Sequence, residues 1–310
     1  MLYPHREANE AQAIPVILHT DIGTDIDDSW ALLMMLNQPQ FKVLQILVDT
    51  GDTKARAAIA ARMLQCAGHS EIEIGLGISD TDKRCPITLA NWMRDYSLEN
   101  YDGRIVGDGI DRMIELIRES PEPVTLISIS PPPALAEALR RAPDIVRNVH
   151  LVGMFGSVHK GYGGGAPSIE YNVVKDLKAT QTLLGAPWLS VTITPLDTCG
   201  IVRLTEDEYS EISSHDEPSV KLLIESFDAW KDYNKNSDEF PGVSSILYDT
   251  VAVHLASSRE FLKMESLKIR VNDEGYTVID NDAGMPIDCA LEWTNLKAYR
   301  RLMLNAIMGK

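Results

Sequence analysis

One short segment of the chain carries enough carboxylates to hold a metal ion. Asp21, Asp25, Asp27 and Asp28 lie within eight residues and directly follow the first apolar run. Carboxylates this close repel one another unless a cation or hydrogen bonds offset the repulsion. Carboxylate oxygens suit a hard cation such as calcium or magnesium, and Gly23 allows a tight turn beneath them. The spacing therefore predicts a metal site.

Other interpretations of the acidic segment account for less of it. Asp27 or Asp28 alone is expected at a helix start near Ser29, because helix N-termini favour acidic caps, but a cap explains only one carboxylate. A calcium loop of the EF-hand type requires a glutamate where this chain has Leu32. A phosphotransferase of the haloacid dehalogenase type requires a nucleophilic aspartate, and this chain has His19 there.

Four further segments combine polar side chains with glycine, proline or an aromatic residue, and most of them follow a predicted strand. They are Asp49-Thr-Gly-Asp52, Pro131-Pro-Pro133, the region from Gly153-Met-Phe-Gly156 through Gly163–Gly165 to Glu170-Tyr-Asn172, and Leu247-Tyr248-Asp249. Glu170 and Asn172 are two apart on an extended segment, so both side chains face the same side and can bind sugar hydroxyls. Each segment alone also fits a turn or a solvated loop.

In this order, the five segments resemble the inosine-uridine-preferring nucleoside hydrolases over roughly residues 14–305. The acidic segment is similar to the family signature D-x-D-x-G-x-D-D, in the longer D-x-D-x-G-x-D-x-D-D variant. His19 stands where the family usually has its first aspartate, and Tyr248 stands where many members have a histidine that protonates the leaving base. The resemblance implies calcium-dependent hydrolysis of the N-glycosidic bond of a ribonucleoside, which gives free base and ribose.

The resemblance also implies roles for individual residues. Calcium would be held by Asp21, Asp28, Asp249 and the carbonyl of Ile129. Asp21 would be the general base that takes a proton from a calcium-bound water. The residues expected to contact the ribose are Asp27, Asp52, Met154, Glu170 and Asn172.

The departure of the base has more than one explanation. His19, His159 and Tyr248 are possible proton donors, and Tyr248 is also placed to stack on the base. Stacking would also raise the proton affinity of the base, and the aromatic residues expected in lid regions are Trp92, Tyr96, Tyr101 and Tyr162. We predict Tyr248 as a catalytic residue and Trp92 as a substrate-binding residue.

Two other functions stay open. The first is hydrolysis of a modified or non-standard ribosyl compound, because Tyr248 and the lid differ from the family pattern. The second is a calcium-loaded ribose-binding protein that has lost catalysis, because both His19 and Tyr248 are departures from the family.

Alternating apolar runs and helical patterns must position these residues. Strands are predicted at 15–18, 43–48, 72–78, 124–130, 149–154 and 189–194, helices at 29–36, 54–67, 109–118, 133–141, 175–184 and 217–233, and a hairpin at 268–271 and 276–279. This alternation predicts an α/β fold, Rossmann-like, with a mainly parallel central sheet flanked by helices. Ligands of such sheets bind beyond the carboxyl ends of the strands. We expect one domain at 14–310, a flexible tail at 1–13 and a lid insertion at 80–107.

The composition limits the partners and the location. The chain has 29 basic and 45 acidic residues and a formal charge of −16, which disfavours nucleic-acid polymers. The four cysteines form no CxxC pair and are typical of reduced thiols. No signal sequence or membrane span is predicted, so a cytoplasmic enzyme for a small-molecule nucleoside is expected. The resemblance further implies a homodimer or homotetramer.

Overall fold

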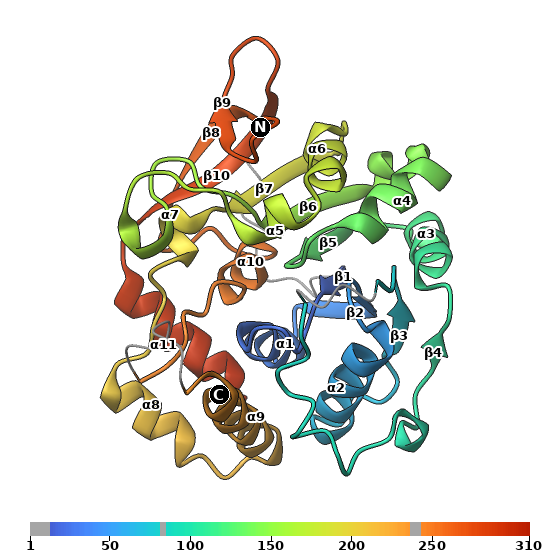
Figure 1. Cartoon of the computed structure of the whole chain (residues 1–310), viewed down its shortest axis with the longest axis vertical. Coiled ribbons are helices and arrows are strands. Elements are labelled where there is room, and N and C mark those ends of the chain that lie inside the picture. Colours follow the sequence, from blue (N-terminus) through green and yellow to red (C-terminus); the bar gives the residue numbers. More distant parts are fainter. Residues whose placement is uncertain (1–12, 81–84, 236–242) are drawn as a thin grey trace.

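The strands form one mixed sheet that crosses the molecule (Figure 1). The structure, a computed structural model, describes residues 13–80, 85–235 and 243–310. Within them the order of the strands is β4-β3-β2-β1-β5-β6-β7-β10-β8-β9. Their bounds are β1 Ile14–Thr20, β2 Phe41–Val48, β3 Glu73–Leu76, β4 Ile105–Val106, β5 Val124–Ser128, β6 Val149–Met154, β7 Ser190–Thr194, β8 Leu262–Val271, β9 Thr277–Ile279 and β10 Met285–Trp293. All the pairs from β4 to β10 are parallel, and only β8 pairs antiparallel with β10 and β9.

Helices cover both faces of this sheet. Their bounds are α1 Asp27–Leu36, α2 Thr53–Cys66, α3 Gly109–Glu119, α4 Pro133–Arg141, α5 Tyr171–Lys175, α6 Leu177–Gly185, α7 Leu196–Cys199, α8 Glu206–Ser213, α9 Pro218–Asn234, α10 Thr250–Leu255 and α11 Leu296–Ile307. Because successive strand residues face opposite sides, Leu18 packs into one core with α1 and α2, while Ile17 packs into a second core with α3 and α4. The predicted α/β fold is confirmed.

Most predicted elements are present, but several have other bounds. Helix α1 begins at Asp27 rather than near Ser29, so two of the acidic side chains belong to its first turn. The single helix predicted at 175–184 is two helices, α5 and α6, because Asp176 leaves the helical conformation and caps α6 through Ala179 N–H. The strand predicted at 72–78 is shorter, since β3 covers only Glu73–Leu76.

A lid was predicted at 80–107, and the part of it that the structure describes after residue 84 packs against α2, the helix that precedes β3. Tyr96 donates a hydrogen bond to Gln65 of α2 at 3.0 Å, and Tyr101 is buried and donates to the carbonyl of Ile72 at 2.7 Å. Its described part also contains β4, which extends the sheet. The lid therefore stays a prediction, and the tail predicted at 1–13 lies, apart from Ala13, outside the described residues. None of the described helices is long and apolar enough to cross a membrane.

Candidate active site

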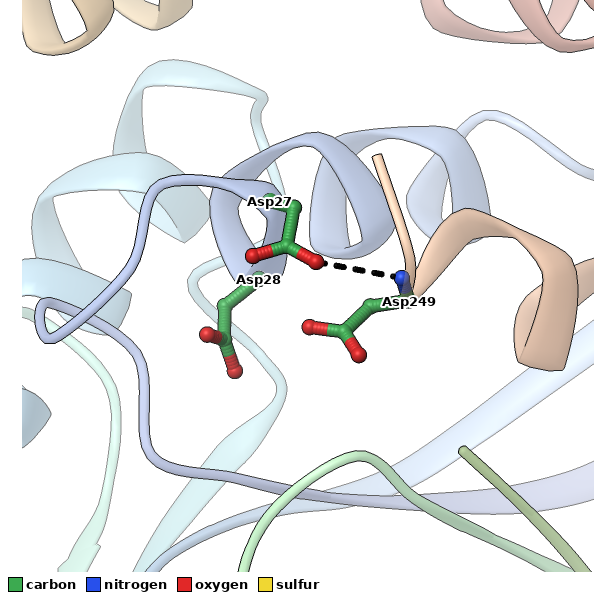
Figure 2. A group of neighbouring side chains, drawn as sticks. All are labelled: Asp27, Asp28 and Asp249. Atoms are coloured by element: carbon green, nitrogen blue, oxygen red, sulfur yellow. Dashed lines mark hydrogen bonds between the residues drawn. The ribbon is translucent and has the colours of Figure 1, made fainter. Parts of the chain in front are cut away.

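Two helix starts bring three aspartates together at the carboxyl edge of the sheet. Asp27 and Asp28 occupy the first turn of α1, which follows β1, and Asp249 immediately precedes α10 (Figure 2). One carboxylate oxygen from each residue lies within 4.8 Å of the others. The backbone N–H of Asp249 donates to Asp27 Oδ2 at 3.2 Å, which joins the two helix starts directly. We call these three residues the aspartate cluster.

The surroundings of the aspartate cluster disfavour negative charge unless a cation is near. All three side chains are buried, and burial raises the pKa of each well above its usual range. Neighbouring carboxylates raise the pKa values further, because like charges repel one another. The first turn of α1 has no side-chain cap among its hydrogen bonds, so helix capping does not explain the two aspartates there. A hard divalent cation fits this set of oxygen donors.

Asp21 lies near the aspartate cluster. It is not one of the three residues whose carboxylate oxygens lie within 4.8 Å of one another. It is buried, and burial raises the pKa of its carboxyl group, while the positive charge of Arg56 opposes that rise. The charge of Asp21 in turn raises the pKa of Asp28 and of Asp249, so the side chains are close enough to interact. The group brought together therefore differs by one member from the three predicted carboxylate ligands, since it contains Asp27 in place of Asp21.

The turn beneath Asp21 depends on the glycine that the sequence singled out. Gly23 has a φ of 101°, and a Cβ there would lie 2.5 Å from the side chain of Ile59 in α2. The carbonyl of Gly23 accepts hydrogen bonds from Thr88 N–H at 2.8 Å and Thr88 Oγ1 at 3.0 Å. The acidic segment is thereby held between α2 and the region after β3.

Glu170, Asn172 and Met154 form a second polar group at the end of β6. Glu170 is buried and accepts from the backbone N–H of Gly156, Asn172 and Val173 at 3.0, 2.7 and 3.2 Å. Burial raises its pKa to about 7, against the lowering effect of these hydrogen bonds. The amide of Asn172 donates to the carbonyl of Met154 at 3.2 Å, so the predicted ribose contacts are rigidly held.

Two other predicted site residues have their own structural roles. Asp52 is exposed and caps α2, accepting from Lys54 N–H and Ala55 N–H at 3.1 and 3.0 Å. Ile129 is buried just beyond β5, and its N–H donates to the carbonyl of His19 at 2.9 Å. The roles predicted for them, in ribose and calcium binding, stay predictions.

Aromatic side chains connect the loops around the site. Tyr248, half-buried beside Asp249, meets Tyr162 edge-on, with ring centroids 6.4 Å apart. The hydroxyl of Tyr162 accepts from the N–H of Tyr171 at 3.1 Å, and the hydroxyl of Tyr171 lies 3.4 Å from the thiol of Cys85. Burial raises the pKa of Tyr248, so this hydroxyl stays protonated and is a weak acid. Tyr248, Tyr162, Tyr171 and Cys85 thus form a row of contacting side chains, and the sequence analysis did not predict Tyr171 or Cys85 as members of it.

Trp92 packs against α2 rather than belonging to the row of aromatic residues just described. The guanidinium of Arg62 lies 4.1 Å from the centre of the Trp92 ring, and it donates to the Trp92 carbonyl at 2.8 Å. This packing accounts for the position of the side chain. Its predicted stacking on a base stays a prediction.

The two histidines predicted as possible donors to the leaving base, His19 and His159, have different surroundings. His19 is completely buried, with one ring nitrogen 2.9 Å from Asp49 Oδ2 and the other 3.0 Å from Ser128 Oγ. Both nitrogens therefore have protein partners, and the proton-donor role of His19 stays a prediction. His159 is exposed, and its backbone N–H bonds to Asp197.

Asp197 and Arg56 hold loops next to the carboxyl ends of the strands, and sequence reasoning missed both. Asp197, in α7 just beyond β7, accepts from the backbone N–H of Val158, His159 and Lys160 at 2.9, 2.7 and 3.1 Å. A carboxylate directly beyond a strand end was the signal that could have revealed it. Arg56 gave no such signal, because its role depends on contacts that only the fold creates.

The fold and the buried aspartate cluster define an α/β protein with the donor set of a metal site at the carboxyl ends of its strands. The sequence model of the family described as "Inosine-uridine preferring nucleoside hydrolase" matches residues 16–302. The chain therefore belongs to this family, whose members are N-glycosidases.

Individual relatives have low sequence identity to this chain, but the alignments cover most of both sequences. Uridine nucleosidase 1 of Arabidopsis thaliana is 23% identical over 275 residues, with 85% of this chain and 80% of the relative covered. The pyrimidine-specific ribonucleoside hydrolase RihA of Citrobacter koseri is 23% identical over 242 residues, covering 72% and 73%. Among solved structures, a plant nucleoside hydrolase has a TM-score of 0.81 at 18% identity, covering 95% of this chain and 99% of that one. A purine-preferring ribonucleoside hydrolase from Gardnerella vaginalis has a TM-score of 0.77 at 21% identity, covering 95% and 98%. At these identities the structural likeness shows the fold.

Proposed function

We propose that the chain hydrolyses the N-glycosidic bond of ribonucleosides with the help of a bound calcium ion, and that Asp21 is the general base. The observation that carries the proposal is the convergence of three buried aspartates beside a fourth, Asp21. Buried carboxylates that raise one another's pKa gain most from a divalent cation. Asp27, Asp28 and Asp249 would hold it, with Asp21 and the Ile129 carbonyl as further candidate ligands. When bound, calcium would orient a water molecule and favour its deprotonation.

The residues of the chain supply the rest of the chemistry. Asp21 takes a proton from the attacking water. The negative charges around it favour the positive charge that develops on the ribose ring as the base departs. Glu170 and Asn172, which are fixed by backbone contacts, bind and orient the ribose hydroxyls together with Met154. Asp52 stands at the exposed side of the same edge, and we propose that it contacts the ribose as well.

Tyr248 is proposed to act on the leaving base. Its raised pKa makes complete proton transfer from the hydroxyl unfavourable. A hydrogen bond from that hydroxyl and the edge-on contact with Tyr162 suit recognition of an aromatic base. The names of relatives include uridine nucleosidase and purine-preferring ribonucleoside hydrolase. We therefore expect a purine or pyrimidine nucleoside as the substrate.

The test is release of free base from purified protein that is offered purine, pyrimidine and modified ribonucleosides, with calcium or with a chelator. Asp21→Ala should lower kcat by roughly 10²- to 10⁴-fold, because a general base contributes about that much. The matched control is Asp25→Asn, which removes a charge from the same loop outside the aspartate cluster. Equal activity of wild type and Asp21→Ala would refute the proposed base.

A second candidate is hydrolysis of a non-standard ribosyl compound, favoured by the tyrosine at position 248. Turnover of modified nucleosides alone would support this candidate, whereas efficient cleavage of uridine, inosine or adenosine would exclude it. Tight ribose binding without turnover of any compound would instead indicate a binding protein.

A further inference from the structure

A buried arginine next to the site takes no part in the chemistry just described. Arg56 lies in the first turn of α2, and its side chain is completely buried. Its Nε donates to the carbonyl of Thr50 at 2.8 Å. Nη1 donates to the carbonyl of Asp21 and, at 3.0 Å, to that of Ile22. Nη2 donates to the hydroxyl of Thr24 at 2.9 Å. One guanidinium thus joins the acidic loop after β1 to the turn after β2.

The partners of Arg56 are unusual for a buried charge. Among the described residues, the hydrogen-bond acceptors of its guanidinium are carbonyl and hydroxyl oxygens, whereas buried charges are ordinarily paired. Arginine stays protonated in proteins, so the charge persists. Its attraction to the carboxylates of Asp21 and Asp28, which opposes the rise in pKa that burial causes in both, supplies the compensation. The acidic loop and Arg56 therefore depend on each other.

The turn after β2 is strained where Arg56 holds it. Thr50 has a φ of 62° and Gly51 a φ of 59°. A β-branched residue rarely adopts this left-handed conformation, and strain of this kind persists only where surrounding contacts enforce it. The carbonyl of Thr50 is the acceptor of Arg56 Nε, and a Cβ on Gly51 would lie 3.2 Å from Arg56 Nη2. The guanidinium fits the strained turn closely.

We infer that Arg56 is a positioning residue, which fixes the backbone of Asp21 against the β2–α2 turn and so sets the place of the Asp21 carboxylate beside the aspartate cluster. Three of its acceptors lie on residues 21–24, so the tether acts on the whole loop rather than on one side chain. The catalytic consequence rests on the proposed function, but the ordering of the loop does not.

The first test measures the loop without any substrate or metal. In calcium-free Arg56→Lys, hydrogen–deuterium exchange should rise in residues 20–28 and 49–53 and stay unchanged elsewhere, because lysine cannot span both loops with its compact ammonium group. The matched control is Arg300→Lys in α11, which alters an arginine paired with Glu208. It should leave exchange in both loops unchanged. Unchanged loop exchange in Arg56→Lys, or a rise spread evenly over the chain, would overturn the inference.

The second test measures turnover on the best nucleoside substrate. Arg56→Lys should lower kcat on the order of 10- to 100-fold, because a misplaced catalytic group costs about that much, while KM stays within about threefold. Guanidinium ion at millimolar concentration should restore part of the kcat of Arg56→Ala. If Arg56→Ala does not fold, Thr24→Val removes one acceptor and should give a smaller rise in loop exchange. A full kcat in Arg56→Lys would contradict the inference, whereas an inactive wild type with the predicted loop exchange would contradict only the proposed function.

Discussion

Two groups of carboxylates in this chain have opposite surroundings. One is the aspartate cluster, and the other consists of Glu137, Asp108 and Asp111 around Arg141. In the aspartate cluster, burial and mutual repulsion raise the pKa values of Asp27, Asp28 and Asp249. On the exposed side of α4, hydrogen bonds from Arg140 and Arg141 lower the pKa of Glu137 to about 2. The fold stabilises the charged form of Glu137 and destabilises the charged forms of the three aspartates.

This difference separates a role in stability from a role in function. Arg141 also bonds Asp108 and Asp111 of the neighbouring region at 2.9 and 2.8 Å, so the group around Arg141 joins α4 to the start of α3. Among the described residues, no lysine or arginine forms an ion pair with the aspartate cluster, although the charge of Arg56 acts on Asp28 at longer range. Groups that oppose folding while they attract a cation are typical of functional sites.

The largest effect is expected from Asp249→Asn. This change removes one negative charge from the aspartate cluster, so kcat should fall on the order of 10³-fold, and calcium should no longer raise the melting temperature. The calcium-free protein should be as stable as wild type or more stable, because repulsion is relieved. Turnover assays and calorimetry with and without a chelator measure both properties. A less stable calcium-free variant that still binds calcium would contradict the interpretation.

Glu170→Gln should have an intermediate effect on the free energy of unfolding, and this effect should depend on pH. The folded-state pKa of Glu170, about 7, exceeds the ordinary value of 4.5, so the folded chain holds a proton that the unfolded chain has released. The stability of wild type relative to Glu170→Gln should therefore decrease as pH rises from about 4.5 to about 7, by at most about 3 kcal/mol. Urea unfolding of both proteins at several pH values without calcium measures this difference. A difference that increases with pH would show that the carboxylate is stabilised in its charged form.

The smallest effect is expected from Glu137→Gln on α4. The Glu137 side chain is half-buried, but its partner Arg140 is exposed and solvent screens the pairs, so the loss of its two arginine partners should lower the melting temperature only slightly. The pairs should weaken further at high salt, and kcat should equal that of wild type. A loss of turnover in this variant would mean that the two groups of carboxylates are coupled through the sheet.

The strands were predictable from sequence because buried parallel strands read as continuous apolar runs, as in β5 and β6. Other elements were not. Strand β10 carries Pro286, Asp288 and Glu292 among its apolar residues, which hides its pattern. Helix α10 has only six residues and is buried on all sides, so it has no helical periodicity to detect.

The candidate site was predictable where it depends on local spacing. The acidic loop and Asp249 were predicted from sequence as parts of a metal site. The start of α1 determines which of these carboxylates come together. Starting the helix at Asp27 places Asp27 and Asp28 together near Asp249. The role of Arg56 could not be predicted from sequence, because an arginine in an alanine-rich helix is common. Its role depends on contacts with the carbonyls of two loops that only the fold brings near it.

The hydrogen bonds between Asp197 and the loop after β6 have a consequence for engineering. The carboxylate of Asp197 holds the loop after β6 through the backbone N–H groups of Val158, His159 and Lys160. The side chains of His159 and Lys160 are exposed, so these hydrogen bonds allow any residue except proline at either position. The loop also leads to Tyr162, whose ring meets Tyr248. A combinatorial library at positions 159 and 160 that omits proline would therefore leave the backbone contacts that hold the loop intact, and assays of the library would test whether these positions affect substrate preference.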